Sequence, residues 1–395
     1  MTEILVQKNK EKKEIALVEN GKLIEYYDES KNEDRNEGNI YIGIVKDIIK
    51  GMQSAFVDIG TEKNSFIHLK DILPKVDETK GHKIEKTDIF KVIKPKQKIL
   101  VQVKKDSNSK KGARVSTHIN LPSKYIVLMP NTNIVTASQK IENKEEQARL
   151  IKLVRENLSK ENGAVIRTSA EGKTEEIIED IKKIENTWQN IIQTSINPNE
   201  NKPELLYKSK DIIEKILMDL MNQNIEKIIV NNNKEKEKIE NIIKENKEYK
   251  NIKVEMKKQG NLFEIYDIEK QIKKSQNRKV WLKCGGFITI DNTEALTAID
   301  VNTGKFTGTN NNLQSTILKV NEEATIEIAK QLRLRDIGGI IIIDYIDMEN
   351  NKDKEKIIKL MNQELKKDRT KTQVEGFTKL DLMELTRKHI CSHKE

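Results

Sequence analysis

The sequence predicts a multidomain α/β protein that contains a small β-barrel. Three observations support this fold class. Short apolar runs separated by glycines fill residues 38–72, helical and strand patterns alternate through residues 125–275, and a regular β-α-β-α order follows from Val280. The 395 residues are enough for two or three domains and for a sizeable core.

The N-terminal segment is expected to contribute two strands. Residues 4–7 and 14–19 are short runs of strand length that are rich in apolar side chains. The polar stretch DESKNEDRNEG at 28–38 then indicates a loop.

A small barrel is predicted from residue 38 onward. Between residues 38 and 72, short apolar runs alternate with polar residues, and three glycines punctuate them, namely Gly43, Gly51 and Gly60. A lysine-rich insert at about 74–97 precedes a further strand at 99–103 and the closing segment KKGARVSTHI. Five short strands in about 80 residues suit a small barrel such as an OB fold.

The middle of the chain mixes both kinds of element. Strands are expected at 125–130 and 163–169, and helices are expected at 145–158 and 174–192. Residues 205–275 continue the alternation of helix and strand. The charged run NNNKEKEKIENIIKENKEYK within them is expected to be a solvated helix face.

The C-terminal region has the clearest α/β pattern. Residues 287–301 read as two strands, 313–334 as a helix and 340–344 as a strand, and a second helix is expected at 352–368. The first helix carries one apolar stripe, formed by Leu313, Ile317, Val320, Ala324, Ile328 and Leu332. Asp336 is assigned to the turn after this helix. The βαβα layout predicts a largely buried sheet.

Two carboxylates follow strands in this region. Asp300 follows the apolar run LTAI, and Asp344 follows residues 340–343. Open α/β sheets bind ligands at the carboxyl ends of their strands, so both carboxylates could meet there, with Asn302 on the same face. Magnesium held by one or two carboxylates suits phosphodiester cleavage, and Asp347 could support it from farther out. The alternative, that Asp300 and Asp344 only end turns after strands, stays open at this point.

Composition narrows the class of protein. No apolar run approaches the roughly 20 residues of a membrane helix, and the N-terminus has no apolar signal core. Two cysteines are too few for a disulfide framework, which favours a reducing, intracellular compartment. The formal charge of +9 suits a polyanionic partner such as nucleic acid, although biased composition would also produce it. There is no phosphate-binding Gly-x-x-x-x-Gly-Lys loop and no Gly-x-Ser-x-Gly elbow.

Around the two carboxylates the sequence resembles the ribonuclease E/G family. The matching runs are DNTEALTAIDVNTGKFTG at 291–308 and AKQLRLRDIGGIIIIDYIDM at 329–348. The resemblance extends over nearly the whole chain and implies four parts: an RNase H-like element, an OB-fold RNA-binding domain, a five-prime sensor and a DNase I-like catalytic domain. The RNase H-like element is expected at residues 1–36 together with 205–277, and the OB-fold domain at 37–119. The sensor is expected at 120–204 and the catalytic domain at 278–395.

The resemblance also implies the reaction. The positions matching Asp300 and Asp344 bind a catalytic Mg²⁺, for which Mn²⁺ could substitute, and the position matching Asn302 assists. The expected activity is endonucleolytic hydrolysis of single-stranded, A/U-rich, 5′-monophosphorylated RNA in rRNA processing and mRNA decay, which leaves a 5′-phosphate and a 3′-hydroxyl. Two rivals stay open: an RNA-binding protein without catalysis, and a different metal phosphoesterase that acts on DNA.

Two further groups of residues take roles from the resemblance. The run GAVIRTSAEGK at 163–173 resembles the five-prime sensor, where Arg167, Thr168 and the backbone of Val127 hold the terminal phosphate. Lys371 stands where the family's sensor has an arginine. Lysine keeps the positive charge but lacks the paired N–H donors of a guanidinium.

The RNA-binding domain supplies the other group. Phe56 and Phe66 match positions where aromatic rings meet bases, and Lys111 matches a phosphate contact. Without the resemblance, both phenylalanines would be expected in the barrel core.

The sequence ends at ELTRKHICSHKE, without the Cys-Pro-x-Cys zinc hook and small domain of larger family members. Cys391 and His393 are a lone pair of candidate ligands, so zinc-linked assembly is in doubt and a homo-oligomer stays open. We expect a free cytoplasmic protein whose partners are RNAs and not a membrane.

Overall fold

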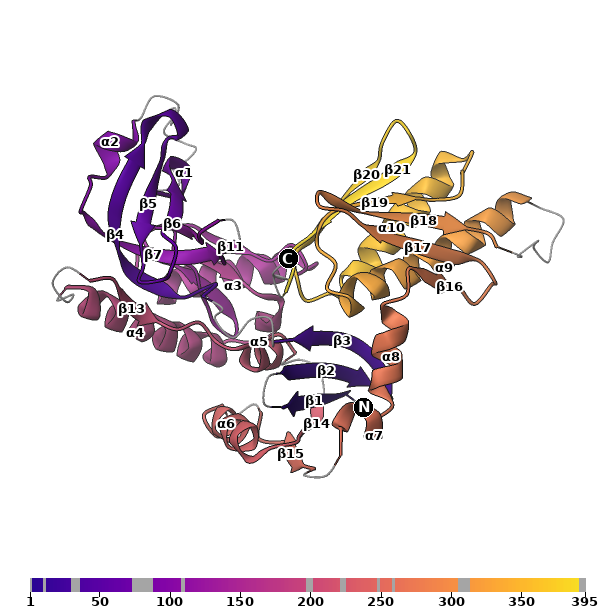
Figure 1. The fold of residues 1–395 in the computed structure, drawn as a ribbon, viewed down its shortest axis with the longest axis horizontal. Coiled ribbons are helices and arrows are strands. Elements are labelled where there is room, and N and C mark those ends of the chain that lie inside the picture. The colour runs from indigo at the N-terminus through magenta and orange to yellow at the C-terminus, as the bar shows by residue number, and fades with distance from the viewer. Residues whose placement is uncertain are drawn as a thin grey trace. The chain divides into compact units, whose positions relative to one another are not determined.

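The computed structural model describes residues 2–9, 12–29, 36–72, 88–107, 111–196, 202–220, 225–246, 249–257, 260–304 and 313–390. The chain forms two units (Figure 1), one from Met1–Glu33 with Gln223–His393 and the other from Asp34–Asn222. Both are mixed α/β structures. Within the described ranges, no helix has both the length and the apolar character needed to cross a bilayer. Cys391 and His393 lie outside these ranges.

The first unit contains a sheet built from both ends of its sequence. Its strand order is β15-β14-β1-β2-β3, with bounds Lys253–Met256, Ile225–Val230, Thr2–Lys8, Lys13–Glu19 and Lys22–Asp28. The predicted strands at 4–7 and 14–19 are confirmed as β1 and β2. Strand β3 was not predicted. Helices α6 (Asn233–Lys244), α7 (Leu262–Ile265) and α8 (Ile268–Ser275) complete this part.

The second unit begins with a closed five-stranded barrel. Its strands are β4 (Ile40–Ile49), β5 (Ser54–Asp58), β6 (Ser65–His68), β7 (Lys98–Lys105) and β8 (Arg114–Ser116), and β4 pairs with both β5 and β7 to close the ring. The predicted small, OB-like barrel is therefore confirmed. Short helices α1 (Leu69–Ile72) and α2 (Ile89–Val92) flank it, and strand β13 (Glu204–Tyr207) extends β4. The lysine-rich insert lies largely outside the described residues.

A four-stranded sheet follows the barrel. Its order is β11-β12-β10-β9, with bounds Val135–Ala137, Gly163–Ile166, Ile126–Met129 and Leu121–Pro122. Helices α3 (Lys144–Asn157) and α4 (Glu175–Ile196) pack on it, as the helical patterns predicted, and α5 (Ile212–Asp219) completes the unit. Asn143 caps α3 by accepting hydrogen bonds from the backbone N–H groups of Glu145 and Glu146.

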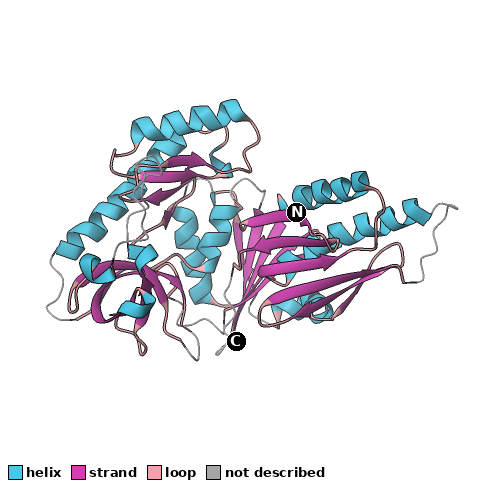
Figure 2. Cartoon of the chain, turned by 90° about the horizontal axis from the view of Figure 1, so that it is seen from above, coloured by secondary structure: helices cyan, strands magenta, loops and turns pink. Residues whose placement is uncertain are grey.

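The C-terminal sheet of the first unit has the order β16-β17-β18-β19-β21-β20. The bounds are Lys279–Trp281, Phe287–Asn292, Leu296–Asn302, Gly339–Asp344, Leu382–Arg387 and Thr372–Phe377. Helix α9 (Leu313–Leu334) connects β18 to β19, which run parallel, and α10 (Asn351–Leu365) follows. The other neighbouring pairs are antiparallel. In Figure 2 the strands and helices of this region form separate layers.

Only one face of this sheet is buried, so the prediction of a largely buried sheet is wrong. Along β18, Ile299 and Val301 are buried, whereas Ala298 and Asp300 are exposed. On β19, Ile340 keeps 51% of its surface exposed while Ile341 is fully buried. Helices α9 and α10 both lie against the buried face, and antiparallel pairing tolerates a solvated second face. We call the solvated surface the open face.

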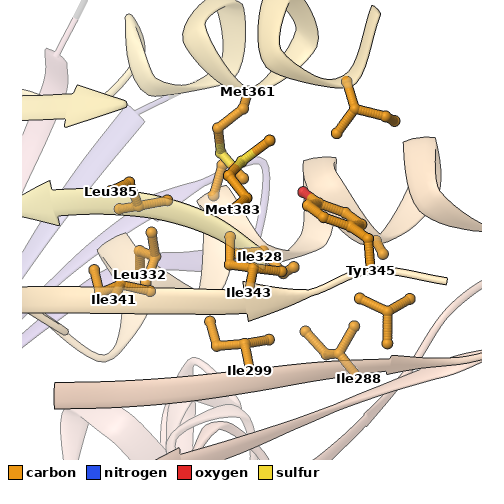
Figure 3. Close-up of a cluster of buried hydrophobic side chains, with 14 of the residues drawn as sticks. Ile288, Ile299, Ile328, Leu332, Ile341, Ile343, Tyr345, Met361, Met383 and Leu385 are labelled. Atoms are coloured by element: carbon orange, nitrogen blue, oxygen red, sulfur yellow. The ribbon is translucent and has the colours of Figure 1, made fainter. Parts of the chain in front are cut away.

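The buried face forms one hydrophobic core with the two helices. Figure 3 shows Met361 of α10 directed toward Met383 of β21, and Ile299 and Ile343 in the same cluster. This packing fixes β18 and β19 side by side, because a register slip of one residue would turn their buried side chains to solvent.

A buried ionic cluster closes the end of this core. Arg387 donates hydrogen bonds to Asp368 at 2.7 Å and to Asp336 at 2.8 Å, and its side chain is fully buried. Asp336 lies in the left-handed conformation directly after α9, which agrees with its predicted place in a turn. Next to Asp368 in sequence, Arg369 pairs with the buried Glu25 of β3. The sequence pattern did not predict any of these ionic contacts.

Candidate active site

Asp300 and Asp344 are neighbours on the open face. Strands β18 and β19 are parallel, and Asp300 is the register partner of Asp344. Neighbouring strands lie about 4.8 Å apart, so the two carboxylates share one small region of the surface. Asn302, two residues farther along β18, donates a hydrogen bond from Nδ2 to Oδ2 of Asp300 at 2.5 Å. The structure thus brings together the three residues expected at the catalytic site.

Mutual repulsion shapes the electrostatics of this pair. Burial raises the pKa of Asp344, and the negative charges of Asp300 and Asp347 raise it further. A cation between the carboxylates would remove that repulsion. The negative charge of Asp347 therefore acts on Asp344, although the side chain of Asp347 is exposed.

The donor set fits a magnesium ion. Mg²⁺ is usually held by one or two carboxylates and keeps several of its waters. Across the residues that the structure describes, no group of three or more His, Cys, Asp or Glu side chains is arranged to hold a metal. Asp300 and Asp344 could hold such a cation as a pair, with the carbonyl oxygen of the Asn302 amide beside them.

The segment after Asp344 is held by a residue that the sequence analysis did not single out. Asn321 of α9 is fully buried. Its Nδ2 donates to the carbonyl of Ile346 at 2.8 Å, and its Oδ1 accepts from the N–H of Ile346 at 3.2 Å. This pair of bonds fixes the backbone between Asp344 and Asp347. A polar residue inside the apolar stripe of a predicted helix was the available signal.

The barrel presents Phe56 and Phe66 outside its core. They face each other across β5 and β6, with ring centroids 6.4 Å apart in an edge-to-face arrangement. Both are half-exposed, whereas Ala55, Val57 and Ile67 beside them are fully buried. The expectation from the residues alone, that both rings fill the core, is wrong because strand alternation turns them outward.

Lys111 lies close to this aromatic pair. Gly112 lies so close to the residue before β6 that a Cβ on it would stand 1.9 Å from the carbonyl oxygen of Asn64. The carbonyl of the next residue, Ala113, accepts a hydrogen bond from the N–H of Phe66 at 2.7 Å. Lys111 is exposed at the start of this contact.

Arg167 is fixed at the end of β12. Its Nη1 donates to the carbonyl of Ser123 at 2.8 Å, and its Nη2 pairs with Asp219. Asp180 of α4 is buried and anchors the same loop by accepting from Ser123 Oγ and from the N–H of Tyr125. Burial lowers the pKa of the nearby Lys210, against the opposing effect of Glu214. The positive charges of Lys124 and Arg167 act in the same direction as burial, so both cationic and anionic groups surround this loop.

Thr168 and Val127 belong to the same small sheet region. Thr168 begins a 3-10 turn directly after Arg167, and Val127 on β10 pairs with Val165 on β12. Lys371 is exposed and lies just before β20 in the other unit. The structure therefore groups three of the four predicted sensor residues.

Comparison with known proteins decides the family. A model described as the Ribonuclease E/G family matches residues 120–390. The chain belongs to the ribonuclease E/G family. It is 38% identical to ribonuclease G of Salmonella typhimurium over 391 residues, which cover 98% of this chain and 79% of that protein. It is 39% identical to ribonuclease G of Haemophilus influenzae over 393 residues, with the same shares covered.

Ribonuclease E of Synechocystis is a further relative. It is 35% identical over 358 residues, which are 89% of this chain and 52% of that protein. The family predicted from the runs at 291–308 and 329–348 is therefore confirmed. Both carboxylates and Arg167 lie inside the matched residues 120–390, while the barrel is included through the near-complete similarity to the ribonuclease G sequences.

Proposed function

We propose that this member of the ribonuclease E/G family is an endoribonuclease that uses a divalent cation at Asp300 and Asp344 to hydrolyse single-stranded RNA. The observation that carries the proposal is the register match of these two carboxylates on an exposed sheet face. Their placement also argues against simple turn-capping roles, because both residues lie within paired strands, Asp300 in β18 and Asp344 in β19.

Each of the three residues would have its own role at the site. When bound, Mg²⁺ or Mn²⁺ supplies charge neutralisation at the phosphate and Lewis-acid activation of water. Asp300 and Asp344 would hold the cation, and the hydrogen bond from Asn302 would keep the Asp300 carboxylate in one orientation. Water would add to phosphorus as the bond to the 3′-oxygen breaks, with its proton passing to that oxygen. The products would be a 5′-phosphate and a 3′-hydroxyl.

The first test is direct. Purified protein is incubated with Mg²⁺ and an end-labelled, 5′-monophosphorylated, A/U-rich RNA strand, with and without chelator. Internal cuts that disappear with chelator support the endonuclease. Tight RNA binding without any cut would favour the alternative of a non-catalytic RNA-binding protein. Equal competition by single-stranded DNA would favour a DNA-directed phosphoesterase.

The barrel would hold the RNA through Phe56, Phe66 and Lys111. Two half-exposed rings offer faces to bases, and the ammonium group offers a contact to phosphate. We expect Phe56→Ala and Phe66→Ala each to weaken RNA affinity by about 5- to 150-fold, because stacking contributes about 1–3 kcal/mol per base. Fluorescence anisotropy with a labelled RNA strand measures this.

The control for these variants is thermal stability. Both rings lie outside the core, so neither variant should change the midpoint of unfolding much. Val57→Ala, which removes two methyl groups from a fully buried side chain, should lower the midpoint. If Phe56→Ala binds RNA as well as the original protein does, the barrel face is not the RNA site.

The loop at Arg167 is proposed as the sensor for a 5′-monophosphate. A guanidinium has five N–H donors, more than the contacts that Arg167 makes with Ser123 and Asp219. Thr168 adds a hydroxyl, and Val127 adds backbone in the same region. Lys371 is proposed to contribute only charge.

Arg167→Ala should remove the preference for a 5′-monophosphate over a 5′-hydroxyl, with little change in basal cleavage. The loss of charged hydrogen bonds worth about 1.5–3 kcal/mol predicts a roughly 10- to 150-fold smaller advantage. Rates on the two RNAs measure it. Arg155→Ala, which removes an exposed arginine of the same unit whose guanidinium contacts the carbonyl of Asn133, is the matched control. An unchanged ratio in Arg167→Ala would refute the sensor assignment.

The finer assignments are also proposals. The sheet β15-β14-β1-β2-β3 would correspond to the RNase H-like element, the barrel to the OB-fold domain, the region at 120–204 to the sensor and the sheet β16–β21 with α9 and α10 to the DNase I-like catalytic domain. Ribosomal RNA precursors and mRNA in the cytoplasm are the proposed substrates.

A further inference from the structure

An aromatic and cationic cluster lies at one edge of the catalytic sheet. Trp281 of β16 and Phe287 of β17 are register partners whose ring centroids are 5.4 Å apart. The Nζ of Lys279 lies 4.1 Å from the centroid of Trp281 and 3.4 Å from that of Phe287. We call these three residues the edge cluster. Trp281 keeps 60% of its surface exposed.

The edge cluster shares the open face with the carboxylates. Phe287 is the register partner of Asn302, which is two residues from Asp300 along β18. Lys279 pairs with Thr289, and Thr289 pairs with Asp300. With about 4.8 Å between strands, the cluster lies roughly 5–10 Å from β18, which carries Asp300 and Asn302, and roughly 10–15 Å from β19, which carries Asp344. This is close enough for adjoining nucleotides of one strand to contact both groups.

Folding does not account for the edge cluster. The hydrophobic core of the sheet contains Ile288 and Ile299 but neither Trp281 nor Phe287. A lysine on the edge strand β16 could serve to deter pairing with another sheet. That role explains Lys279 but not a large aromatic ring left mostly in solvent, where apolar surface usually marks a binding site.

We propose that the edge cluster is a nucleotide subsite that holds the RNA strand beside the scissile phosphate. This inference rests on the proposed ribonuclease activity. The Trp281 and Phe287 rings would stack on a base, and Lys279 would pair with a neighbouring phosphate. The positive charge of Lys279 would offset the repulsion between the phosphate backbone and the exposed carboxylates Asp300, Asp344 and Asp347. Stacking of this kind tolerates any base, so the subsite would favour single strands and not a sequence.

Tryptophan fluorescence gives a direct readout. The chain has two tryptophans, and the other, Trp188, is buried in the second unit. In the Asp300→Asn protein, which is expected to cleave RNA far more slowly, addition of an A/U-rich RNA strand should quench Trp281 fluorescence and saturate at the affinity given by anisotropy. Trp281→Phe in the same background should abolish the quenching. Trp188→Phe, if it folds, should retain it.

Steady-state kinetics give the second readout. Trp281→Ala should lower kcat/KM by about 5- to 150-fold through KM, with kcat nearly unchanged, and Trp281→Phe should recover most of the loss. The matched control is Ile340→Ala, which removes an exposed apolar side chain from the opposite end of the same face and should change neither constant.

Three results would overturn the subsite. RNA binding by anisotropy without any change in Trp281 fluorescence would place the strand elsewhere. An unchanged KM in Trp281→Ala would do the same. A fluorescence change that depends on protein concentration without RNA would instead identify the edge cluster as a contact between copies of the chain. Metal-dependent cleavage by the original protein tests the ribonuclease activity separately, so the two failures can be told apart.

Discussion

Asp300→Asn and Asp344→Asn are each expected to reduce RNA cleavage by about 10²- to 10³-fold or more. In the proposed site the two carboxylates, which are register partners, hold the cation, and a bound cation is worth several kcal/mol of transition-state stabilisation. An amide keeps the shape of the side chain but loses the charge that holds the cation. Initial rates with a labelled RNA strand at saturating Mg²⁺ measure the effect.

Binding and stability should separate from activity in these variants. RNA affinity should stay within a few-fold of the original value, because the barrel residues are untouched. The midpoint of unfolding should hold or rise slightly, since burial and then the charge of Asp300 raise the pKa of Asp344, and each substitution relieves the repulsion between the two carboxylates. Glu384→Gln removes an exposed carboxylate from the same face and should cost little activity. Cleavage within tenfold of the original rate in both aspartate variants would exclude this site.

Arg387→Met is expected to lower the free energy of unfolding by about 3–5 kcal/mol. Its guanidinium is fully buried between Asp368 and Asp336, and removing the arginine leaves two buried carboxylates without their cation. The backbone N–H of Ile390 also donates to Asp336, which joins the segment after β21 to the turn before β19. Loss of the arginine should therefore weaken the contact between these two segments. Urea unfolding followed by circular dichroism measures the loss.

The control for Arg387→Met is an ion pair at the surface. Lys356→Met breaks the contact between Lys356 of α10 and Glu322 of α9, where both side chains face solvent, and should leave the unfolding curve nearly unchanged. A loss below about 1 kcal/mol in Arg387→Met would mean that the two carboxylates are accommodated without the arginine, for example by protonation.

Local pattern predicted much of the fold because the responsible interactions are short-range. Helix α9 was predicted from one apolar stripe, and β1, β2 and β19 from runs of apolar side chains. Strand β3 was missed because Glu25 and the tyrosines of LIEYYD do not read as a core strand. Glu25 is nevertheless buried, where its charge is compensated by Arg369, more than 300 residues later, and by a hydrogen bond from the hydroxyl of Tyr27.

The direction of individual side chains was less predictable. From the residues alone, Phe56 and Phe66 were expected in the core, but strand alternation fixes only that neighbouring residues face opposite ways. The choice follows from the closure of the barrel, which turns Val57 and Ile67 inward. The open face of the catalytic sheet arose in the same way, because both helices after β18 pack on one side.

The sequence by itself determined the family, the strands that end in Asp300 and Asp344, and the helix that joins them, because these depend on residue type and local periodicity. The tertiary structure alone decided that the two carboxylates are register partners, that Asn321 fixes the segment between Asp344 and Asp347, and that Trp281 and Phe287 lie on the same open face. Such relations depend on strand order and register, which are set by long-range packing of the core and not by any local pattern.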